Sequence, residues 1–250
     1  MFSEKVLAVK NLVKSYHGIR AVDGISFGVA AGEIVGLLGP NGAGKTSTIN
    51  MILGLLEPDA GEISVFGKNF KTHRSEILSK VSFAAVYAQL PGNLWVEQNL
   101  RIFAILYGIP NPKKKVQLLM QEFELTQFAR SKTAFLSSGE QSRLNLAKAM
   151  LNDPKLILLD EPTASVDPST SEILRSRILE YARANQSGIL WTSHDMYEIE
   201  AVCHRVLFIS HGKILLEGDP KKLPAEYGKK NLEELFITVA REPLTLSHRP

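Results

Sequence analysis

The chain has 250 residues, of which 44% are hydrophobic, and its 29 basic and 26 acidic side chains give a formal net charge of +3. A chain of this length can bury a sizeable core as one domain with an inserted lobe, and so mild a charge does not indicate a nucleic-acid-binding protein. The lone cysteine, Cys203, excludes an internal disulfide. We expect a soluble cytoplasmic protein, because no stretch has the ~18 apolar residues of a membrane-spanning helix and the N-terminus lacks the apolar core of a secretory signal.

Short strands are expected at the beginning of the chain. Residues 6–9 indicate an exposed strand, and the stretch that follows is punctuated by Gly18, Gly24, Gly28 and Gly32. Such spacing predicts an antiparallel β lobe. Residues 61–67, which have a glycine at each end, predict a further short strand.

The most informative segment is residues 39–46, which read Gly-Pro-Asn-Gly-Ala-Gly-Lys-Thr and match the phosphate-loop pattern G-x-x-x-x-G-K-[ST]. Glycines let successive backbone N–H groups approach phosphate oxygens without a Cβ in the way. An apolar run at residues 34–38 predicts a buried strand before the loop, and a helix after it is predicted by Ile49, Ile52, Leu53 and Leu56. The alternative is a chance glycine-rich turn, which the flanking strand and helix disfavour.

Two side chains at the end of this loop have distinct expected roles. Lys45 would place a positive charge between the β- and γ-phosphates, and the Thr46 hydroxyl would be an oxygen ligand for Mg²⁺. The sequence therefore predicts a site for a nucleoside triphosphate with its magnesium ion.

A helical stretch is expected between residues 91 and 152. Apolar residues recur at helical spacing in two runs: Leu100, Phe103, Ala104 and Tyr107, then Val116, Leu119, Met120 and Phe123. This stretch is the candidate inserted lobe. The basic cluster at residues 113–115 has no interleaved aromatic residue and predicts a solvated face.

A second candidate anion site is residues 136–140, which read Leu-Ser-Ser-Gly-Glu ahead of an amphipathic run. Ser137 with Glu140, or Ser138 with Gln141, matches a capping box, in which a helix satisfies its own first N–H groups. A Ser-Gly helix start is also a ready anion site, because it offers N–H donors at the positive end of the helix dipole. The position of this segment between the phosphate loop and a later pair of carboxylates favours the anion site.

That pair of carboxylates closes a continuous apolar strand at residues 156–159. Asp160 is placed to hold the hydration shell of a magnesium ion, and Glu161 is placed to accept a proton from an attacking water. The alternative is that both side chains only cap the exit loop of the strand.

Strands and helices are expected to alternate in the rest of the chain. Residues 189–193 predict a strand that ends at His194, and Asp195 with Glu198 predicts a capping box on the next helix. Residues 205–217 predict a hairpin around His211 and Gly212. After residue 220 the tail is basic, and a short docked helix is predicted by Leu232, Leu235 and Phe236.

Taken in this order, the motifs of residues 6–220 resemble those of ATP-binding cassette (ABC) ATPases, the nucleotide-binding subunits of membrane transporters. The resemblance implies an α/β fold of the P-loop NTPase class, with a RecA-like core, an antiparallel β lobe and an inserted α-helical lobe. It implies β lobe and core at residues 1–88, helical lobe at 89–153, core at 154–220 and a C-terminal tail at 221–250.

The resemblance also implies site residues. The implied catalytic residues are Glu161, His194 and Gln89. The implied magnesium ligands are Thr46, Gln89 and Asp160, the last of them through water. The implied ATP-binding residues have two parts. Tyr16 is the aromatic residue that stacks on adenine. The rest belong to the phosphate loop: Gly39, Pro40, Asn41, Gly42, Ala43, Gly44, Lys45, Thr46 and Ser47. Ser165 and Asp167 match the D-loop.

The segment at residues 136–140 departs twice from the L-S-G-G-Q form of the family, with Ser138 in place of the first glycine and Glu140 in place of the glutamine. Ser138 is compatible with the motif if its side chain caps the helix. The Glu140 carboxylate would repel a γ-phosphate unless it turns away or pairs with a cation such as Arg143.

The partners that the resemblance implies are a second nucleotide-binding subunit, in a homodimer, and separate permease subunits. ATP on one subunit would be closed over by residues of the other: Ser137, Ser138, Gly139 and Glu140. The cofactors would be ATP and Mg²⁺, with no nucleic-acid partner, and the chain would be peripheral on the inner face of the cell membrane. Leu94, Trp95 and Phe103 are candidates for the permease surface, although core burial is expected for at least two of them.

The direction of transport is inferred by analogy. Residues 99–109, residues 205–220 and the tail resemble bacterial exporters more than nutrient importers. Within the family, the alternatives are an importer ATPase and a non-transport soluble cassette protein. Outside it, the alternative is a phosphate-loop kinase, whose product would be a phosphorylated metabolite instead of free phosphate.

Overall fold

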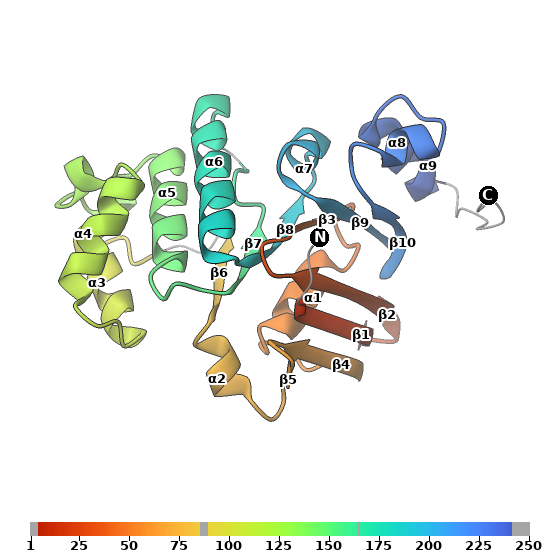
Figure 1. Ribbon diagram of the computed structural model, residues 1–250, viewed down its shortest axis with the longest axis horizontal. Helices are drawn as coiled ribbons and strands as arrows, with labels where there is room; N and C mark the ends of the chain where they lie inside the picture. The colour runs from red at the N-terminus through yellow and green to blue at the C-terminus, as the bar shows by residue number, and fades with distance from the viewer. Residues whose placement is uncertain (1–4, 86–89, 165, 242–250) are drawn as a thin grey trace.

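The computed structural model describes residues 5–85, 90–164 and 166–241. Two β-sheets occupy the middle of the molecule, a group of helices lies at one end, and the last helices of the chain lie at the other (Figure 1). No helix in these three ranges combines the length and the apolar character needed to cross a bilayer.

The smaller sheet has four antiparallel strands in the order β2-β1-β4-β5. Their bounds are β1 (Lys5–Tyr16), β2 (Ile19–Ala30), β4 (Ala60–Val65) and β5 (Lys68–Asn69). The turn between β1 and β2 is tight, because His17 and Gly18 both adopt positive φ, 48° and 80°, as a two-residue hairpin turn requires. This sheet is the β lobe that the glycine spacing predicts.

The larger sheet has six strands in the order β10-β9-β3-β8-β7-β6, and all neighbours are parallel except β9 and β10. The strands are β3 (Ile34–Leu38), β6 (Val81–Ala85), β7 (Leu156–Asp160), β8 (Gly188–Ser193), β9 (Arg205–Ser210) and β10 (Lys213–Gly218). The strands expected around the phosphate loop, the carboxylates and His194 are confirmed. The sequence reading missed β6, because five residues that include a serine and two alanines give a weak strand signal.

Two hydrophobic cores lie on opposite faces of this larger sheet. Val35 and Leu37 belong to the core beneath the β lobe and α1 (Lys45–Ile52), whereas Ile34 and Leu38 belong to the core on the other face. Helices α6 (Pro168–Asn185) and α7 (Met196–Val202) supply side chains to that second core. The apolar run before the phosphate loop is continuous because both faces of its strand are buried.

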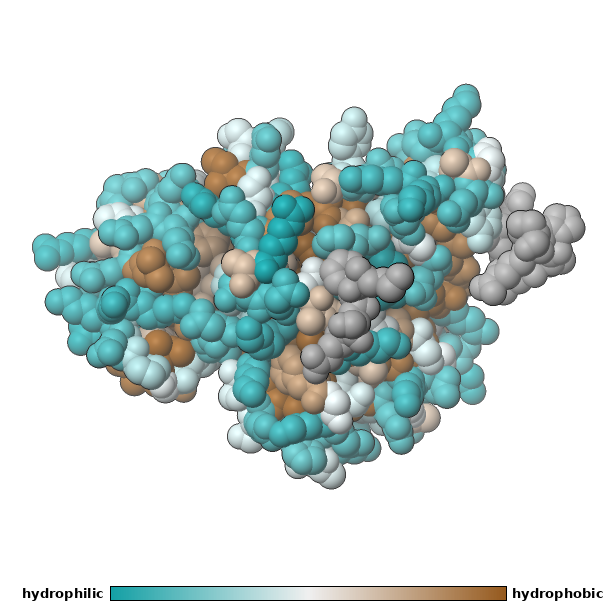
Figure 2. All heavy atoms as spheres, in the orientation of Figure 1, coloured by the Kyte–Doolittle hydropathy of each residue, from teal (hydrophilic) through white to brown (hydrophobic). Residues whose placement is uncertain are grey.

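The inserted helical lobe contains α3 (Val96–Leu106), α4 (Pro112–Glu122), α5 (Ser138–Ala149) and two short 3-10 helices at Thr126–Phe128 and Thr133–Phe135. A short helix, α2 (Arg74–Leu78), precedes β6. The surface in Figure 2 is mostly hydrophilic, with apolar side chains in small groups. On α3, however, Ile102, Ile105 and Leu106 are all exposed.

The tail folds back onto the core. Leu232, Leu235 and Val239 of α9 (Leu232–Arg241) are buried in the core that contains β9, and the rings of Phe236 and Phe208 lie 5.7 Å apart. The short helix α8 (Leu223–Glu226) precedes α9. The docked helix that the sequence predicts is therefore present, and Val239 extends its buried face.

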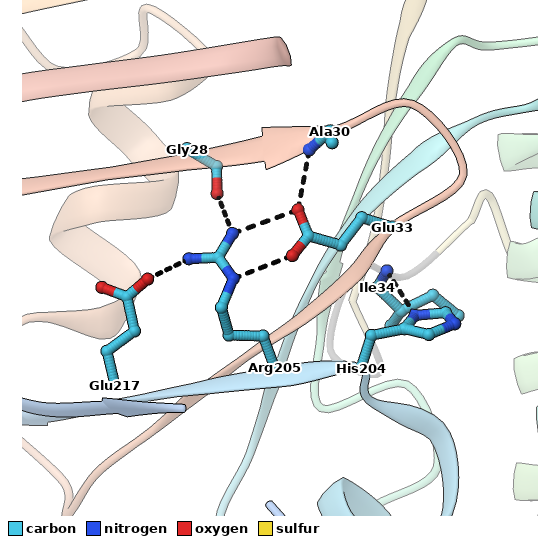
Figure 3. Close-up of polar contacts among 7 residues, drawn as sticks. All are labelled: Gly28, Ala30, Glu33, Ile34, His204, Arg205 and Glu217. Carbon is cyan, nitrogen blue, oxygen red and sulfur yellow. Dashed lines mark hydrogen bonds and ion pairs between the residues drawn. The ribbon is translucent and has the colours of Figure 1, made fainter. Parts of the chain in front are cut away.

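A network around Arg205 joins the two sheets at the end remote from the phosphate loop (Figure 3). Its guanidinium donates to both carboxylate oxygens of Glu33, at 2.8 and 3.1 Å, and to the carbonyl of Gly28 on β2. The same group also pairs with Glu217 on β10. A bidentate, mostly buried arginine–carboxylate pair holds a defined geometry, so the β lobe is fixed against the edge of the core.

Candidate nucleotide site

A cavity of about 850 Å³ opens at the carboxyl end of the larger sheet. Residues 40–47 line one side of it, and Ala21, Asp160, Glu161 and His194 complete the lining. Parallel sheets collect ligand sites at this end, because the strands deliver their following loops to one edge. The fold therefore brings together the phosphate loop, both carboxylates and the histidine, which come from three different strand ends.

The glycines of the loop are required by close backbone approach. A Cβ on Gly39 would lie 2.2 Å from the carbonyl oxygen of Ile209, and a Cβ on Gly44 would lie 2.4 Å from that of Ala21. Gly44 also has a φ of 108°, which a residue with a side chain rarely adopts. The loop is thus held against neighbouring backbone on one side while its other side faces the cavity.

The turn of the β9–β10 hairpin supports the phosphate loop from behind. The Gly212 N–H donates to the Ala43 carbonyl at 3.1 Å, and the Gly212 carbonyl accepts from the Asp23 N–H at 2.9 Å. Residues of the last strands and of the β lobe therefore fix the loop. The sequence predicts this hairpin but contains no signal for its contact with the loop.

Helix α1 begins at the end of the loop without an internal cap. Gly44 occupies the N-cap position, it has no side chain to accept from the first N–H groups, and the first turn contains no acidic residue. Backbone donors at a helix N-terminus need an acceptor, and they favour an anion. This end of α1 lines the cavity through Lys45, Thr46 and Ser47.

Lys45 is buried and folds back along the loop. Its Nζ donates to the carbonyls of Gly39, at 2.6 Å, and Pro40, at 3.1 Å. Burial lowers the pKa of the ammonium group, whereas the nearby carboxylates of Glu161 and Asp160 act in the opposite direction. The positive charge is therefore held between the loop and the carboxylates.

Thr192 holds the two carboxylate-bearing residues in place and is absent from the sequence-based set. Its hydroxyl donates to Asp160 Oδ1 at 2.5 Å and accepts from the Glu161 N–H at 3.2 Å, while its carbonyl also accepts from that N–H. Glu161 has a φ of 50°, so the chain turns sharply after β7. A fully buried threonine on a central strand resembles any core residue in sequence, and only the pairing of β7 with β8 shows its role.

His194 faces Glu161 across the cavity mouth. Its Nδ1 lies 3.1 Å from Glu161 Oε2, and the imidazole is 67% exposed whereas the carboxylate is 20% exposed. Asp195 caps the following helix, with Oδ1 accepting from the Tyr197 N–H at 2.9 Å. The predicted reciprocal capping box is wrong, because the Glu198 side chain is buried and bonds Thr163 instead of the Asp195 backbone.

Tyr16 lies at the tip of the β1–β2 hairpin near the start of α1. Its ring is 43% exposed, and its hydroxyl oxygen lies 3.5 Å from Ser47 Oγ. An exposed ring beside the phosphate loop is available for stacking on a planar group.

The start of α5 lies outside the cavity and has a capping box of its own. Ser137 is the N-cap: the Glu140 N–H donates to its Oγ at 3.4 Å, and the Ser137 N–H donates to Glu140 Oε2 at 2.8 Å. The Ser137–Glu140 alternative for the capping box is therefore correct, and Ser138 is the first residue of the helix. Arg143 pairs with Glu124 at 3.2 Å, so the suggested Glu140–Arg143 pair is wrong and Glu140 turns back on its own helix.

Of the remaining predicted catalytic and D-loop residues, the structure describes only Asp167. Gln89 and Ser165 lie outside the described residues. Asp167 caps α6, with Oδ1 accepting from the Thr170 N–H at 3.0 Å, and this bond holds the pKa of the carboxyl down at about 2. Its side chain is thus fixed as an anion at the start of that helix.

Comparison with known proteins decides the family. A sequence profile described as ABC transporter matches residues 22–164. The chain belongs to the ABC transporter family. Family members with this domain are the ATP-binding, ATP-hydrolysing subunits of transporters. The chain is therefore an ABC ATPase, as the order of the motifs predicts.

Relatives and solved structures agree with this assignment. Nod factor export ATP-binding protein I of Burkholderia pseudomallei is 39% identical over 218 residues, covering 86% of this chain and 71% of the relative. A solved ATP-binding subunit of an ABC transporter superposes with a TM-score of 0.83 at 30% identity, covering 94% of this chain and 99% of its own. CbiO1 from Clostridium perfringens, part of the ABC transporter complex cbiONQ, gives 0.81 at 25% identity, covering 90% and 92%. The predicted fold, a P-loop NTPase with a β lobe and helical insertion, is confirmed.

The residues of the cavity fit ATP and a magnesium ion. The backbone cradle, the uncapped α1 and Lys45 supply donors and positive charge for phosphate oxygens. Thr46 and Asp160 offer oxygen ligands to the same space, while the described ranges contain no group of three or more histidine, cysteine or acidic side chains arranged so that it could hold a metal ion. Mg²⁺ suits such a site, because it keeps several waters and takes its other ligands from phosphates.

Proposed function

We propose that this ABC ATPase powers an exporter, and that two copies of the chain close head to tail over ATP. The observation that supports this best is the division of helix starts: α1 lacks a cap beside the cavity, whereas the α5 start, with its Ser-Ser-Gly sequence, lies away from the cavity of its own chain. A second copy would bring α5 to the cavity. A single chain then holds half of each site.

In this proposal, one chain binds the nucleotide through its β lobe and phosphate loop. Tyr16 stacks on the adenine, residues 39–47 hold the phosphates, and Lys45 exchanges its bonds to the loop carbonyls for phosphate oxygens. The magnesium ligands are Thr46, Gln89 and Asp160, the last through water. A bound Mg²⁺ neutralises charge that develops on the transferred phosphoryl group.

Hydrolysis is assigned to Glu161, His194 and Gln89. Glu161 accepts a proton from the attacking water, and the hydrogen bond that its backbone N–H donates to Thr192 Oγ1 fixes the position of the residue. His194, already 3.1 Å from Glu161, contacts the γ-phosphate in the closed pair. Positioning and electrostatics then supply most of the rate, because the loose transition state of phosphoryl transfer needs little covalent help.

The second copy contributes Ser137, Ser138, Gly139 and Glu140, with Ser165 and Asp167 of the D-loops between the two chains. The Ser137 hydroxyl can accept from the Glu140 N–H and still donate its proton to a phosphate oxygen, because a hydroxyl has both capacities. Closure excludes water, and loss of the γ-phosphate reopens the pair. We propose a homodimer, with residues 1–88 and 154–220 as β lobe and core, 89–153 as helical lobe and 221–250 as tail.

Export through separate permease subunits is supported by two observations. Curated relatives bear the name Nod factor export ATP-binding protein I. The exposed Ile102, Ile105 and Leu106 form an apolar patch on α3, and such patches mark partner surfaces. Trp95 is exposed too, whereas Leu94 and Phe103 are partly buried, so at most one of the three expected contacts is freely available. The chain would be held at the inner face of the cell membrane by the permease.

The dimeric site is tested by the dependence of phosphate release on chain concentration. If the site needs two copies, the rate at low concentration rises with the square of the chain concentration and becomes linear once the pairs are formed. A self-contained site gives a linear dependence throughout and would refute the proposal. Detection of free phosphate, with no phosphorylated metabolite, excludes the kinase alternative.

A mixing experiment tests the head-to-tail arrangement. Lys45→Ala removes the phosphate-loop charge, and Ser137→Asp keeps an N-cap residue while placing a carboxylate where phosphate would bind. Each variant alone should release little phosphate, and the mixture should recover activity, because one of its two sites combines an intact loop with an intact Ser137. The matched control mixes Lys45→Ala with a chain that carries both substitutions. This mixture contains no intact phosphate loop and should stay inactive.

A further inference from the structure

Two segments that are far apart in the sequence lie side by side in the helical lobe. One is residues 91–97, which lead into α3, and the other is residues 129–136, which lead to the N-cap of α5. Four backbone hydrogen bonds of 2.9–3.1 Å join them: Thr133 N to Leu94 O, Ala134 N to Gly92 O, Val96 N to Ser131 O and Glu97 N to Ala129 O. The two segments are therefore held together by their backbones.

One buried side chain cross-links the same two segments. Asn99, in the first turn of α3, is 1% exposed, and its Nδ2 donates to the Pro91 carbonyl at 3.0 Å and to Thr133 Oγ1 at 2.8 Å. The Thr133 hydroxyl, also buried, donates in turn to the Leu94 carbonyl at 3.2 Å. Asn99 and Thr133 thus form a continuous polar bridge between the segments.

This bridge is not arranged for maximal stability. Asn99 Oδ1 is buried and has no hydrogen-bond partner among the described atoms. A buried acceptor without a partner is unfavourable, and an apolar residue of similar shape would avoid that cost. What Asn99 supplies is a pair of directed donors, which fix the two segments at one distance and register.

The bridge ends close to the start of α5, at residues 136–140. Thr133 opens the turn that leads to Ser137: the Leu136 N–H donates to the Thr133 carbonyl at 3.2 Å, and the Leu136 carbonyl accepts from Gln141 Nε2 at 3.0 Å. Hydrogen bonds therefore connect Thr133 through Leu136 to Gln141 of α5. Ser137, the N-cap of that helix, directly follows Leu136.

We propose that Asn99 and Thr133 are positioning residues for ATP hydrolysis: their bridge sets where the α5 start meets the partner's nucleotide, although neither residue contacts it. The inference rests on the proposed head-to-tail site. The further point is that residues 91–95, where the chain enters the helical lobe, control the placement of Ser137.

The test is Thr133→Val, which keeps the shape of the side chain and removes the bridging oxygen. The kcat for phosphate release should fall about 10- to 100-fold, because displacement of a site group by about 1 Å has effects of this size. Binding of a fluorescent ATP analogue to dilute chain should stay within about twofold of the parent value, since the phosphate loop is untouched. Thr133→Ser, which restores the hydroxyl, should recover most of the kcat.

A matched control separates positioning from loss of stability. Val116→Ala opens a cavity in the core of the same lobe, away from the bridge, and should lower Tm while leaving kcat near the parent value. In a double-mutant cycle, Asn99→Leu and Thr133→Val should be non-additive in kcat, because each removes the same contact. An unchanged kcat in Thr133→Val, an equal loss in Val116→Ala, or no recovery in Thr133→Ser would each overturn the inference. The parent chain's concentration dependence distinguishes these results from failure of the dimeric site itself.

Discussion

The starts of α1 and α5 are built in opposite ways. At α1, Gly44 provides no cap and the first turn has no acidic residue, so the backbone donors face the cavity. At α5, Ser137 and Glu140 satisfy each other's N–H groups within the chain. No side chain caps the first N–H groups of α1, whereas the capping box of α5 satisfies two N–H groups within the chain.

This difference has a functional consequence. The uncapped α1 can bind phosphate in a single chain, because its donors gain an acceptor that the protein does not provide. The capped α5 gains less from an anion, and in the proposed pair it contributes only when a second copy approaches. Binding and hydrolysis should therefore respond differently to mutation at the two helices.

The largest effect is expected at Glu161, which we propose as the proton acceptor in hydrolysis. Glu161→Gln should leave ATP binding at α1 intact and slow phosphate release by about 10²–10⁴-fold, the usual range for loss of a general base. Phosphate release and binding of a fluorescent ATP analogue measure the two properties separately. Near-normal turnover would assign the proton acceptor to another group.

The role of the α1 start is tested by substitution of Gly44. Gly44→Ala combines a φ of 108° with a Cβ 2.4 Å from the Ala21 carbonyl, whereas Gly42→Ala has a φ of 79° and open space around its Cβ. Gly42→Ala should cost about 1–2 kcal/mol of unfolding free energy, the left-handed backbone penalty alone. Gly44→Ala should lose more stability and more nucleotide affinity. Equal losses in denaturant titrations of the two variants would contradict the packing argument.

Charge at the α1 start is tested by Lys45→Ala. Loss of a charge-assisted contact to phosphate should weaken nucleotide binding by about 10- to 100-fold. A matched control is Lys68→Ala, which removes an exposed lysine paired with Glu76 and should leave affinity unchanged. Titration with a fluorescent nucleotide measures both variants, and unchanged binding in Lys45→Ala would contradict the phosphate-loop assignment.

The smallest effect is expected at the start of α5, from removal of the Glu140 charge. Glu140→Gln keeps the capping box, since glutamine accepts the same bond, and removes a negative charge that the proposed head-to-tail pair would bring near the partner's γ-phosphate. ATP-dependent pairing should tighten by about fivefold at most, because charges at 4 Å in water interact with about 1 kcal/mol, and the gain should fade at high salt. Sedimentation with ATP, in a Glu161→Gln background, measures the pairing. Glu122→Gln, an exposed change of equal charge, should have no effect.

The fold could be predicted from the sequence because its signals are local. The alternation of apolar strands and amphipathic helices, the loop pattern at residues 39–46 and the carboxylates after β7 are all local, and the structure has each of them. Apart from β6, the misses concern contacts between distant residues. Of the two alternatives for Glu140, turning away or pairing with a cation such as Arg143, the structure has the first, because Arg143 pairs with Glu124. Glu198 bonds Thr163, 35 residues away in the sequence, instead of the helix start beside it.

The sequence by itself determined that this chain binds a phosphate-bearing nucleotide, because the glycines, Lys45 and Thr46 act through their own backbone and their immediate neighbours. Only the tertiary structure decided how that site is held. Thr192 reaches Asp160 because β7 and β8 are adjacent, and Gly212 reaches Ala43 because a late hairpin returns to the loop. Such contacts depend on which strands pair and where turns land, and no short stretch of sequence contains that information.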